Sequence, residues 1–203
     1  FSGTAWSNTT VISVATSDHA SCGKPSALVM FGGFTGAVAV DTAYKFDGSS
    51  WSSTGALPSA KYLIRGCGIQ NAGLGCGGGT VATGYGVKTY KFNTDTWSTT
   101  GDLNENKNKH SLIGKQNSAV CLNGTVDDAW TMTLNVEKYN GSSWAIVGVT
   151  VTDSAYMGFS GISNSAMIFQ GTGTNIPDLT QKWNGYVTYM GAIPSGGGAT
   201  GLY

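Results

Sequence analysis

The sequence predicts an all-β protein built from repeated four-stranded units, and two observations carry this prediction. First, an aromatic residue followed by a polar turn and usually Trp recurs every 44 to 47 residues, in FSGTAW, FDGSSW, FNTDTW, YNGSSW and WNGYVT. Second, no stretch of the 203 residues combines helical spacing of apolar residues with plausible helix caps. A recurrence of this length is the signature of a repeat architecture.

Four landmarks recur in each unit: the aromatic residue, the Trp (replaced by Thr188 in the last unit), a first Gly and a second Gly. The Trp follows the aromatic residue by 5 positions, the first Gly follows the Trp by 17, and the second Gly follows the first by 10. Only the step from the second Gly to the next aromatic residue varies, between 12 and 15 residues. The first glycines are Gly23, Gly68, Gly114 and Gly161, and the second are Gly33, Gly78, Gly124 and Gly171.

Each unit is interpreted as four short strands, named A to D in chain order and separated by Gly, Asn, Asp and Ser turn residues. Strand A, as in LIRGC, runs up to the first Gly and is followed by a four-residue turn such as GIQN. Strand B is ALVMF, AGLGC, SAVCL or SAMIF, apolar at successive positions, which predicts burial on both faces. Strand C is AYKF, TYKF, VEKY or TQKW, and strand D begins at the Trp after a tight polar turn.

Units of this size cannot bury their faces alone, and a radial arrangement protects the strand edges, so we expect a β-propeller. Residues 1–203 then form one propeller domain or segment. Partial units stand at both ends, which predicts a piece of a larger ring of five or more blades, or a product completed by another chain. The repeats run approximately over 6–50, 51–96, 97–143 and 144–187, with a partial repeat at 188–203.

Paired glycines follow the second strand at Gly32–Gly33 and Gly77–Gly78, and each pair is followed by Tyr and then Trp. In this respect the unit resembles the kelch repeat, although Asn123–Gly124 and Gln170–Gly171 depart from the double glycine. The Gly/Ser/Thr/Asn-rich texture also resembles kelch-like repeat regions of phage tail-fibre and other virion surface proteins. The first resemblance implies a propeller fold, and the second implies a virion or extracellular location.

Composition excludes several partner classes. Only 11% of the residues are charged and the formal net charge is zero, so binding to nucleic acid or to a membrane surface by bulk electrostatics has no support. No apolar run approaches transmembrane length, and we expect no membrane insertion.

The cysteines and histidines give no local signal for a cofactor, a metal or an enzyme. No CxxC or HxxxH spacing occurs, and Cys76 and Cys121 fall in apolar strand B, where buried thiols act as small hydrophobic groups. His19 and His110 both lie 4 residues before a first Gly, a position that tolerates a polar ring near the central channel. Neither has a recognisable acid or nucleophile partner, so we expect no catalytic site, no metal site and no cofactor.

Binding function is expected on the face where connections B–C and D–A emerge, because all length variation lies there and exposed loops on a rigid scaffold commonly bind ligands. Trp130 belongs to no repeated position, and it is either packed over the next blade or offered to a ligand. Asp127 and Asp128 could bind a cation, accept hydrogen bonds from sugar hydroxyls, or simply be solvated. The candidate ligand-binding residues are Trp130, Asp127, Asp128, Tyr85, Phe34 and His110.

These observations favour a non-enzymatic binding or adhesion module that presents its variable loops to a host-surface glycan or protein receptor. The alternative is a structural repeat segment that assembles or spaces a fibre or particle without a ligand of its own. Its partners would be other virion or fibre subunits or further copies of the chain in a homo-oligomer.

Overall fold

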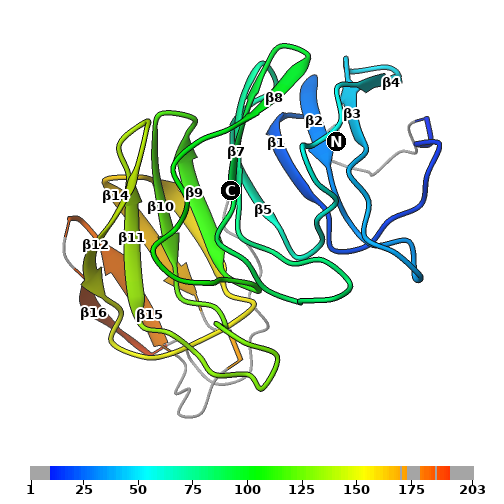
Figure 1. Ribbon diagram of the computed structural model, residues 1–203. Helices are drawn as coiled ribbons and strands as arrows, with labels where there is room; N and C mark the ends of the chain where they lie inside the picture. The colour runs from blue at the N-terminus through cyan, green and yellow to red at the C-terminus, as the bar shows by residue number, and fades with distance from the viewer. Residues whose placement is uncertain (1–9, 170, 173–178, 186, 193–203) are drawn as a thin grey trace.

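The computed structural model describes residues 10–169, 171–172, 179–185 and 187–192 (Figure 1). Two parts of the repeat pattern lie outside the described residues: the first aromatic–Trp pair, Phe1 and Trp6, and most of the B–C connection of the last unit, at 173–178. None of the described residues belongs to a helix long and apolar enough to span a membrane.

The described strands form four antiparallel sheets of four strands each. Blade 1 contains β1 (Ala20–Lys24), β2 (Ala27–Phe31), β3 (Ala43–Phe46) and β4 (Trp51–Thr54). Blade 2 contains β5 (Arg65–Ile69), β6 (Ala72–Cys76), β7 (Thr89–Asn93) and β8 (Thr96–Thr99). Blade 3 contains β9 (Ser111–Lys115), β10 (Ser118–Leu122), β11 (Asn135–Tyr139) and β12 (Trp144–Val149). Blade 4 contains β13 (Gly158–Ile162), β14 (Ser165–Phe169), β15 (Leu179–Trp183) and β16 (Val187–Ala192).

The predicted all-β propeller is confirmed: the chain is a four-bladed β-propeller arrangement. Figure 1 shows the sheets side by side, from β1–β4 in blue and cyan to β15 and β16 in orange and red. Each sheet keeps chain order, so its A strand is innermost and its D strand outermost, and β1 packs on β5, β5 on β9 and β9 on β13. Each sheet starts with strand A and therefore combines three strands of one predicted repeat with the D strand of the next.

Three hydrophobic clusters fill the spaces between successive blades. The aromatic landmark and its Trp contribute to these clusters as a stacked pair, with ring centroids 4.8 Å apart for Phe92 and Trp97 and 5.0 Å apart for Tyr139 and Trp144. Trp97 also contacts Phe31 of the preceding blade at 4.6 Å. These landmark aromatics therefore act as wedges that hold one blade against the next.

Polar groups repeat between blades as regularly as the aromatics. The Lys before the aromatic landmark reaches a turn of the next blade: Lys45 Nζ lies 2.9 Å from Asp95 Oδ1, Lys91 Nζ lies 2.6 Å from the Gly141 carbonyl oxygen, and Lys138 Nζ lies 2.8 Å from Asn164 Oδ1. The N–H of the second Gly donates to a backbone carbonyl of the next D–A segment. These bonds join Gly33 to Lys61 at 2.7 Å, Gly78 to Lys107 at 2.8 Å and Gly124 to Ser154 at 3.0 Å.

The strand order separates two faces of the propeller. The A–B and C–D turns lie on one, which we call the turn face, and the longer B–C and D–A connections lie on the other, which we call the loop face. On the loop face each D–A segment forms a β-bridge with the start of the B–C loop of its own blade. The bridged pairs are Ser17–Phe34, Tyr62–Gly79, Asn108–Thr125 and Ala155–Thr172.

Candidate functional site on the loop face

A ring of backbone positions defines the centre of the loop face. The residue five positions before each first Gly is left-handed in all four blades, with φ of 53° at Asp18, 55° at Leu63, 51° at Lys109 and 55° at Tyr156. Non-glycine residues seldom adopt this conformation, so it is held by its surroundings. The N–H of Leu63 donates to the Asp18 carbonyl at 2.9 Å, and the N–H of Tyr156 donates to the Lys109 carbonyl at 2.9 Å.

Trp130 projects from a hairpin-like loop between β10 and β11. The loop closes through a bridge between Thr125 and Met132, and the N–H of Thr131 donates to Asp127 Oδ1 at 2.8 Å. Hydrogen bonds from Thr131 hold the pKa of Asp127 below its usual value. Asp127 therefore shapes this loop. Trp130 has φ of 64°, a strained conformation for a bulky side chain.

Trp130, Tyr156 and Lys109 form one cluster contributed by three separate connections. Lys109 Nζ lies 3.6 Å from the centroid of the Trp130 ring and 5.9 Å from that of Tyr156, within the range of a cation–π interaction. The two ring centroids lie 6.1 Å apart. Trp130 is nevertheless 46% exposed and Tyr156 48% exposed. The indole therefore packs on Lys109 and beside Tyr156 of blade 4, and it still presents a large surface to solvent.

The cluster continues across the loop face towards blade 1. Both the Asp128 carboxylate and the Tyr62 hydroxyl lie beside Gly84, where a Cβ atom would collide with the carboxylate. The Tyr62 ring lies 5.5 Å from the Phe34 ring, measured between centroids. Aromatic rings and charged groups thus alternate over loops from several blades. We call Phe34, Tyr62, Asp128, Trp130, Lys109 and Tyr156 the loop-face cluster.

The charges of the cluster are partly screened from water. Burial lowers the pKa of Lys109, and the nearby Asp128 carboxylate opposes this effect. Burial raises the pKa of Tyr156, so its hydroxyl stays protonated and can donate a hydrogen bond. The cluster therefore offers a hydroxyl and a carboxylate beside exposed aromatic rings, while the Lys109 side chain is buried beneath the indole.

The structure separates the remaining candidates. Tyr85 is partly buried in the B–C connection of blade 2. His110 is only 1% exposed, so it lies inside the molecule and not on the loop-face surface. The sequence pattern did not identify Lys109, Tyr156 or Tyr62. Comparing D–A segments by their distance from the first Gly would have placed Lys109 and Tyr156 at one position of the ring.

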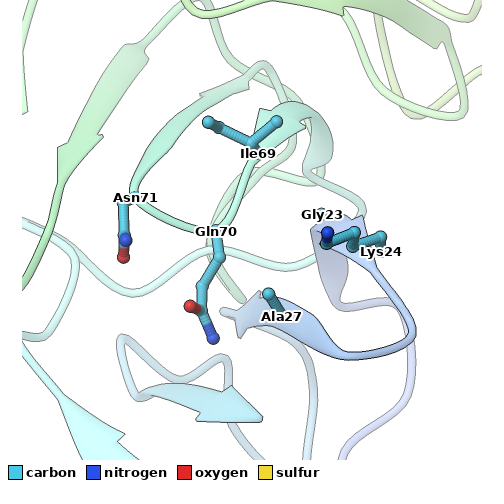
Figure 2. A pocket seen from close by; sticks show the side chains of 6 residues that line it. All are labelled: Gly23, Lys24, Ala27, Ile69, Gln70 and Asn71. Carbon is cyan, nitrogen blue, oxygen red and sulfur yellow. The ribbon is translucent and has the colours of Figure 1, made fainter. Parts of the chain in front are cut away.

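A hollow on the turn face is a second, weaker candidate. Its volume is about 340 Å³, and it lies between the A–B turns of blades 1 and 2 (Figure 2). Ile69 lines it together with Lys24, and the Gln70 amide is already engaged, because it donates to the carbonyl oxygens of Leu28 and Phe46. An apolar hollow with so few converging polar groups offers little basis for specific recognition.

A third group of chemistry-bearing side chains is buried between blades 2 and 3. The ligand atoms of Cys76, His110 and Cys121 all lie within 4.8 Å of one another, and Cys76 Sγ lies 3.7 Å from His110 Nε2. Burial raises the pKa of the Cys76 thiol. Burial also acts to raise the pKa of Cys121, but the hydrogen bond from Cys76 and the neighbouring His110 outweigh it and lower that pKa.

The comparisons with known proteins concern the fold. No protein family model matches the chain, and no curated protein matches it. The solved structure of YjhT is similar with a TM-score of 0.72, covering 92% of this chain and 68% of its own, at 11% sequence identity. At this identity the similarity shows a shared propeller architecture and carries no information about the ligand.

Proposed function

We propose that the chain is a non-enzymatic binding module of a virion or extracellular surface and that its loop-face cluster binds a glycan. The observation that carries this proposal is the exposed Trp130–Tyr156 pair, held by Lys109 and flanked by Asp128. The kelch-like repeat and the likeness to tail-fibre repeat regions agree with it, because such surface proteins commonly contact a host.

The chemistry of the cluster favours a sugar ligand. Exposed aromatic rings provide flat apolar surfaces for the C–H faces of a sugar, while the Tyr156 hydroxyl and the Asp128 carboxylate exchange hydrogen bonds with its hydroxyl groups. The strained backbone at Trp130 supports a binding role, since such conformations concentrate at ligand sites. The rigid blades below the loops reduce the entropy lost on binding.

A glycan array probed with the purified chain tests the proposal, followed by titration of the best glycan. Trp130→Ala and Tyr156→Phe separate the contribution of the ring from that of the hydroxyl. We expect Trp130→Ala to weaken binding by at least about tenfold. Ile69→Ala is the matched control, because Ile69 is 63% exposed but lies on the turn face.

Several results would contradict the proposal. Binding that is equally sensitive to Ile69→Ala and Trp130→Ala would remove the loop face from the function. Capture of a host protein without any glycan signal would favour a protein receptor. Self-association into fibres without ligand binding would favour the structural alternative.

A further inference from the structure

The Cys–His group occupies three positions that recur in every described blade interface. The first position lies two residues before the second Gly of one blade. The second lies four residues before the first Gly of the next blade, and the third lies three residues before its second Gly. Between blades 1 and 2 these positions hold Phe31, Ile64 and Gly75, and between blades 3 and 4 they hold Leu122, Met157 and Ile168. Between blades 2 and 3 they hold Cys76, His110 and Cys121.

In the two flanking interfaces the three positions serve packing. Phe31 and Ile64 are both 0% exposed, and a Cβ atom at Gly75 would lie 2.7 Å from the Phe31 ring. Leu122, Met157 and Ile168 belong to one buried cluster. In the middle interface all three positions carry a sulfur or nitrogen donor. Replacement at one position would be an ordinary core variation, but replacement at all three creates a convergent donor set.

Some buried polar atoms of the middle interface lack hydrogen-bond partners. Among the described residues, His110 Nδ1 and Glu137 Oε1 are buried without a hydrogen-bond partner, and His110 Nε2 faces sulfur. A buried polar atom without a partner is destabilising, so a histidine here is unfavourable compared with Ile64 or Met157. Coordination of an ion by the imidazole would supply an interaction much stronger than a contact to sulfur.

The local backbone leaves room for the histidine of the donor set. Gly77 has φ of 67°, and a Cβ atom there would lie 2.5 Å from His110 Cε1, so only glycine leaves room for the ring. The charged neighbours are already engaged by other protein groups. Asn104 donates two hydrogen bonds to Glu137 Oε2, and Lys107 Nζ is engaged by Glu105 at 2.6 Å, so neither side chain occupies the space between the sulfurs and the imidazole.

We propose that Cys76, His110 and Cys121 form a buried binding site for one thiophilic metal ion, zinc(II) or copper(I), which fastens blade 2 to blade 3. Two thiolates and an imidazole are the donors that both ions prefer, and sulfur ligands disfavour magnesium and calcium. The site is enclosed, so the ion is structural and independent of the loop-face cluster.

The test is metal content and metal titration of the purified chain under reducing, oxygen-free conditions. We expect about one zinc(II) or copper(I) ion per chain, with cobalt(II) as a spectroscopic probe giving sulfur-to-metal charge-transfer bands. Separate titrations with zinc(II) and copper(I) against a competing chelator decide between the two ions. Cys67→Ala is the control, because Cys67 is also a buried thiol of this interface but lies outside the donor set.

Two triple variants remove the donors while keeping a packing solution that the molecule already uses. The first is Cys76→Phe, His110→Ile and Cys121→Gly, and the second is Cys76→Leu, His110→Met and Cys121→Ile. Both should bind no ion, and their thermal midpoints should not respond to added metal, whereas the unchanged chain should gain stability on metal addition. If neither variant folds, the stoichiometry and charge-transfer bands of the unchanged chain still decide.

The proposal is overturned if the unchanged chain takes up neither ion, or if a folded triple variant takes up as much. It is also overturned if neither ion binds and Cys76 and Cys121 remain joined by a disulfide under the same reducing conditions. Mass spectrometry would show this disulfide as a chain that is lighter by two hydrogen masses.

Discussion

The interface between blades 1 and 2 and the interface between blades 2 and 3 share one geometry and differ in chemistry. In the first, the large Phe31 ring fills the space that the neighbouring Gly75 leaves open. In the second, the smaller Cys76 stands in place of Phe31, and Cys121 carries a side chain where Gly75 has none. Volume is thus distributed differently in the two interfaces, while the inner strands pack in the same way, β1 on β5 and β5 on β9.

The two interfaces therefore hold different residues at equivalent positions of the same strand arrangement. Close packing in a core tolerates exchange of side chains when total volume is kept. The wedges and lysine contacts repeat between blades, so the three variable positions can be used for packing in one interface and for donor atoms in another.

The largest effect is expected for Phe31→Ala. This change removes a fully buried ring that contacts Trp97 and leaves a cavity between blades 1 and 2. We expect a loss of about 3–5 kcal/mol in the free energy of unfolding, measured by urea denaturation. Cys76→Ala at the equivalent position in metal-free protein should cost about 1 kcal/mol, because far less volume is removed. Equal losses of stability would show that the Phe31 side chain fills no more of its interface than Cys76 fills of the next one.

A second prediction concerns Gly75→Ala. The added Cβ atom meets the Phe31 ring at 2.7 Å and Ile64 Cδ1 at 3.3 Å, so we expect a loss of about 1–3 kcal/mol from overpacking. The loss should shrink in a Phe31→Leu background, because the smaller side chain vacates the space. Cys121→Ala is the matched control, since that position already holds a Cβ atom. If the stability losses of Gly75→Ala and Phe31→Leu simply add in the double variant, the Phe31 ring does not occupy the space beside Gly75.

Much of the fold could be predicted from the sequence because the repeat constrains it at several levels. The fixed spacings locate every strand B, and β2, β6, β10 and β14 have the bounds of the four apolar runs. Turn residues and the aromatic–Trp pairs are local signals, and local signals survive in a single sequence.

The sites were less accessible to prediction for physical reasons. Trp130 was recognisable because it interrupts the repeat, but its partner Lys109 comes from another connection and is found only once blades are placed together. Cys76, His110 and Cys121 are brought together by the contact between blades, so no short spacing along the chain reveals them. Tertiary neighbours from different blades leave no local motif.

A third prediction compares the lysine contacts of the two interfaces. Lys91 Nζ donates to the Gly141 carbonyl oxygen at 2.6 Å and to Asn117 Oδ1 at 3.0 Å, joining blade 2 to two turns of blade 3. Lys91→Met keeps the alkyl stem but removes both bonds, and we expect a loss of about 1–2 kcal/mol by urea denaturation. Lys24→Met, on the exposed turn face, is the control and should change stability little. A neutral Lys91→Met would mean that the lysine contact adds nothing to the junction of blades 2 and 3.

The smallest effect is expected at the exposed lysine contact between blades 1 and 2. The hydrogen bond from Lys45, followed by that from Thr54, holds the pKa of Asp95 below its usual value. A carboxyl group whose folded pKa is depressed contributes stability that is present above its unfolded pKa of about 3.9 and is lost as pH falls through the folded value. Asp95→Asn should therefore lower stability slightly at neutral pH and flatten its decline below about pH 4, measured as urea midpoints at successive pH values. Because the Asp95 side chain is solvent-exposed, raising the salt concentration should reduce the difference in stability between Asp95→Asn and the unchanged chain. The stability lost in Lys91→Met should depend less on salt, because the partners of Lys91 are neutral oxygens. An acid decline that is identical in both proteins would show that the Lys45 contact adds nothing to the junction of blades 1 and 2.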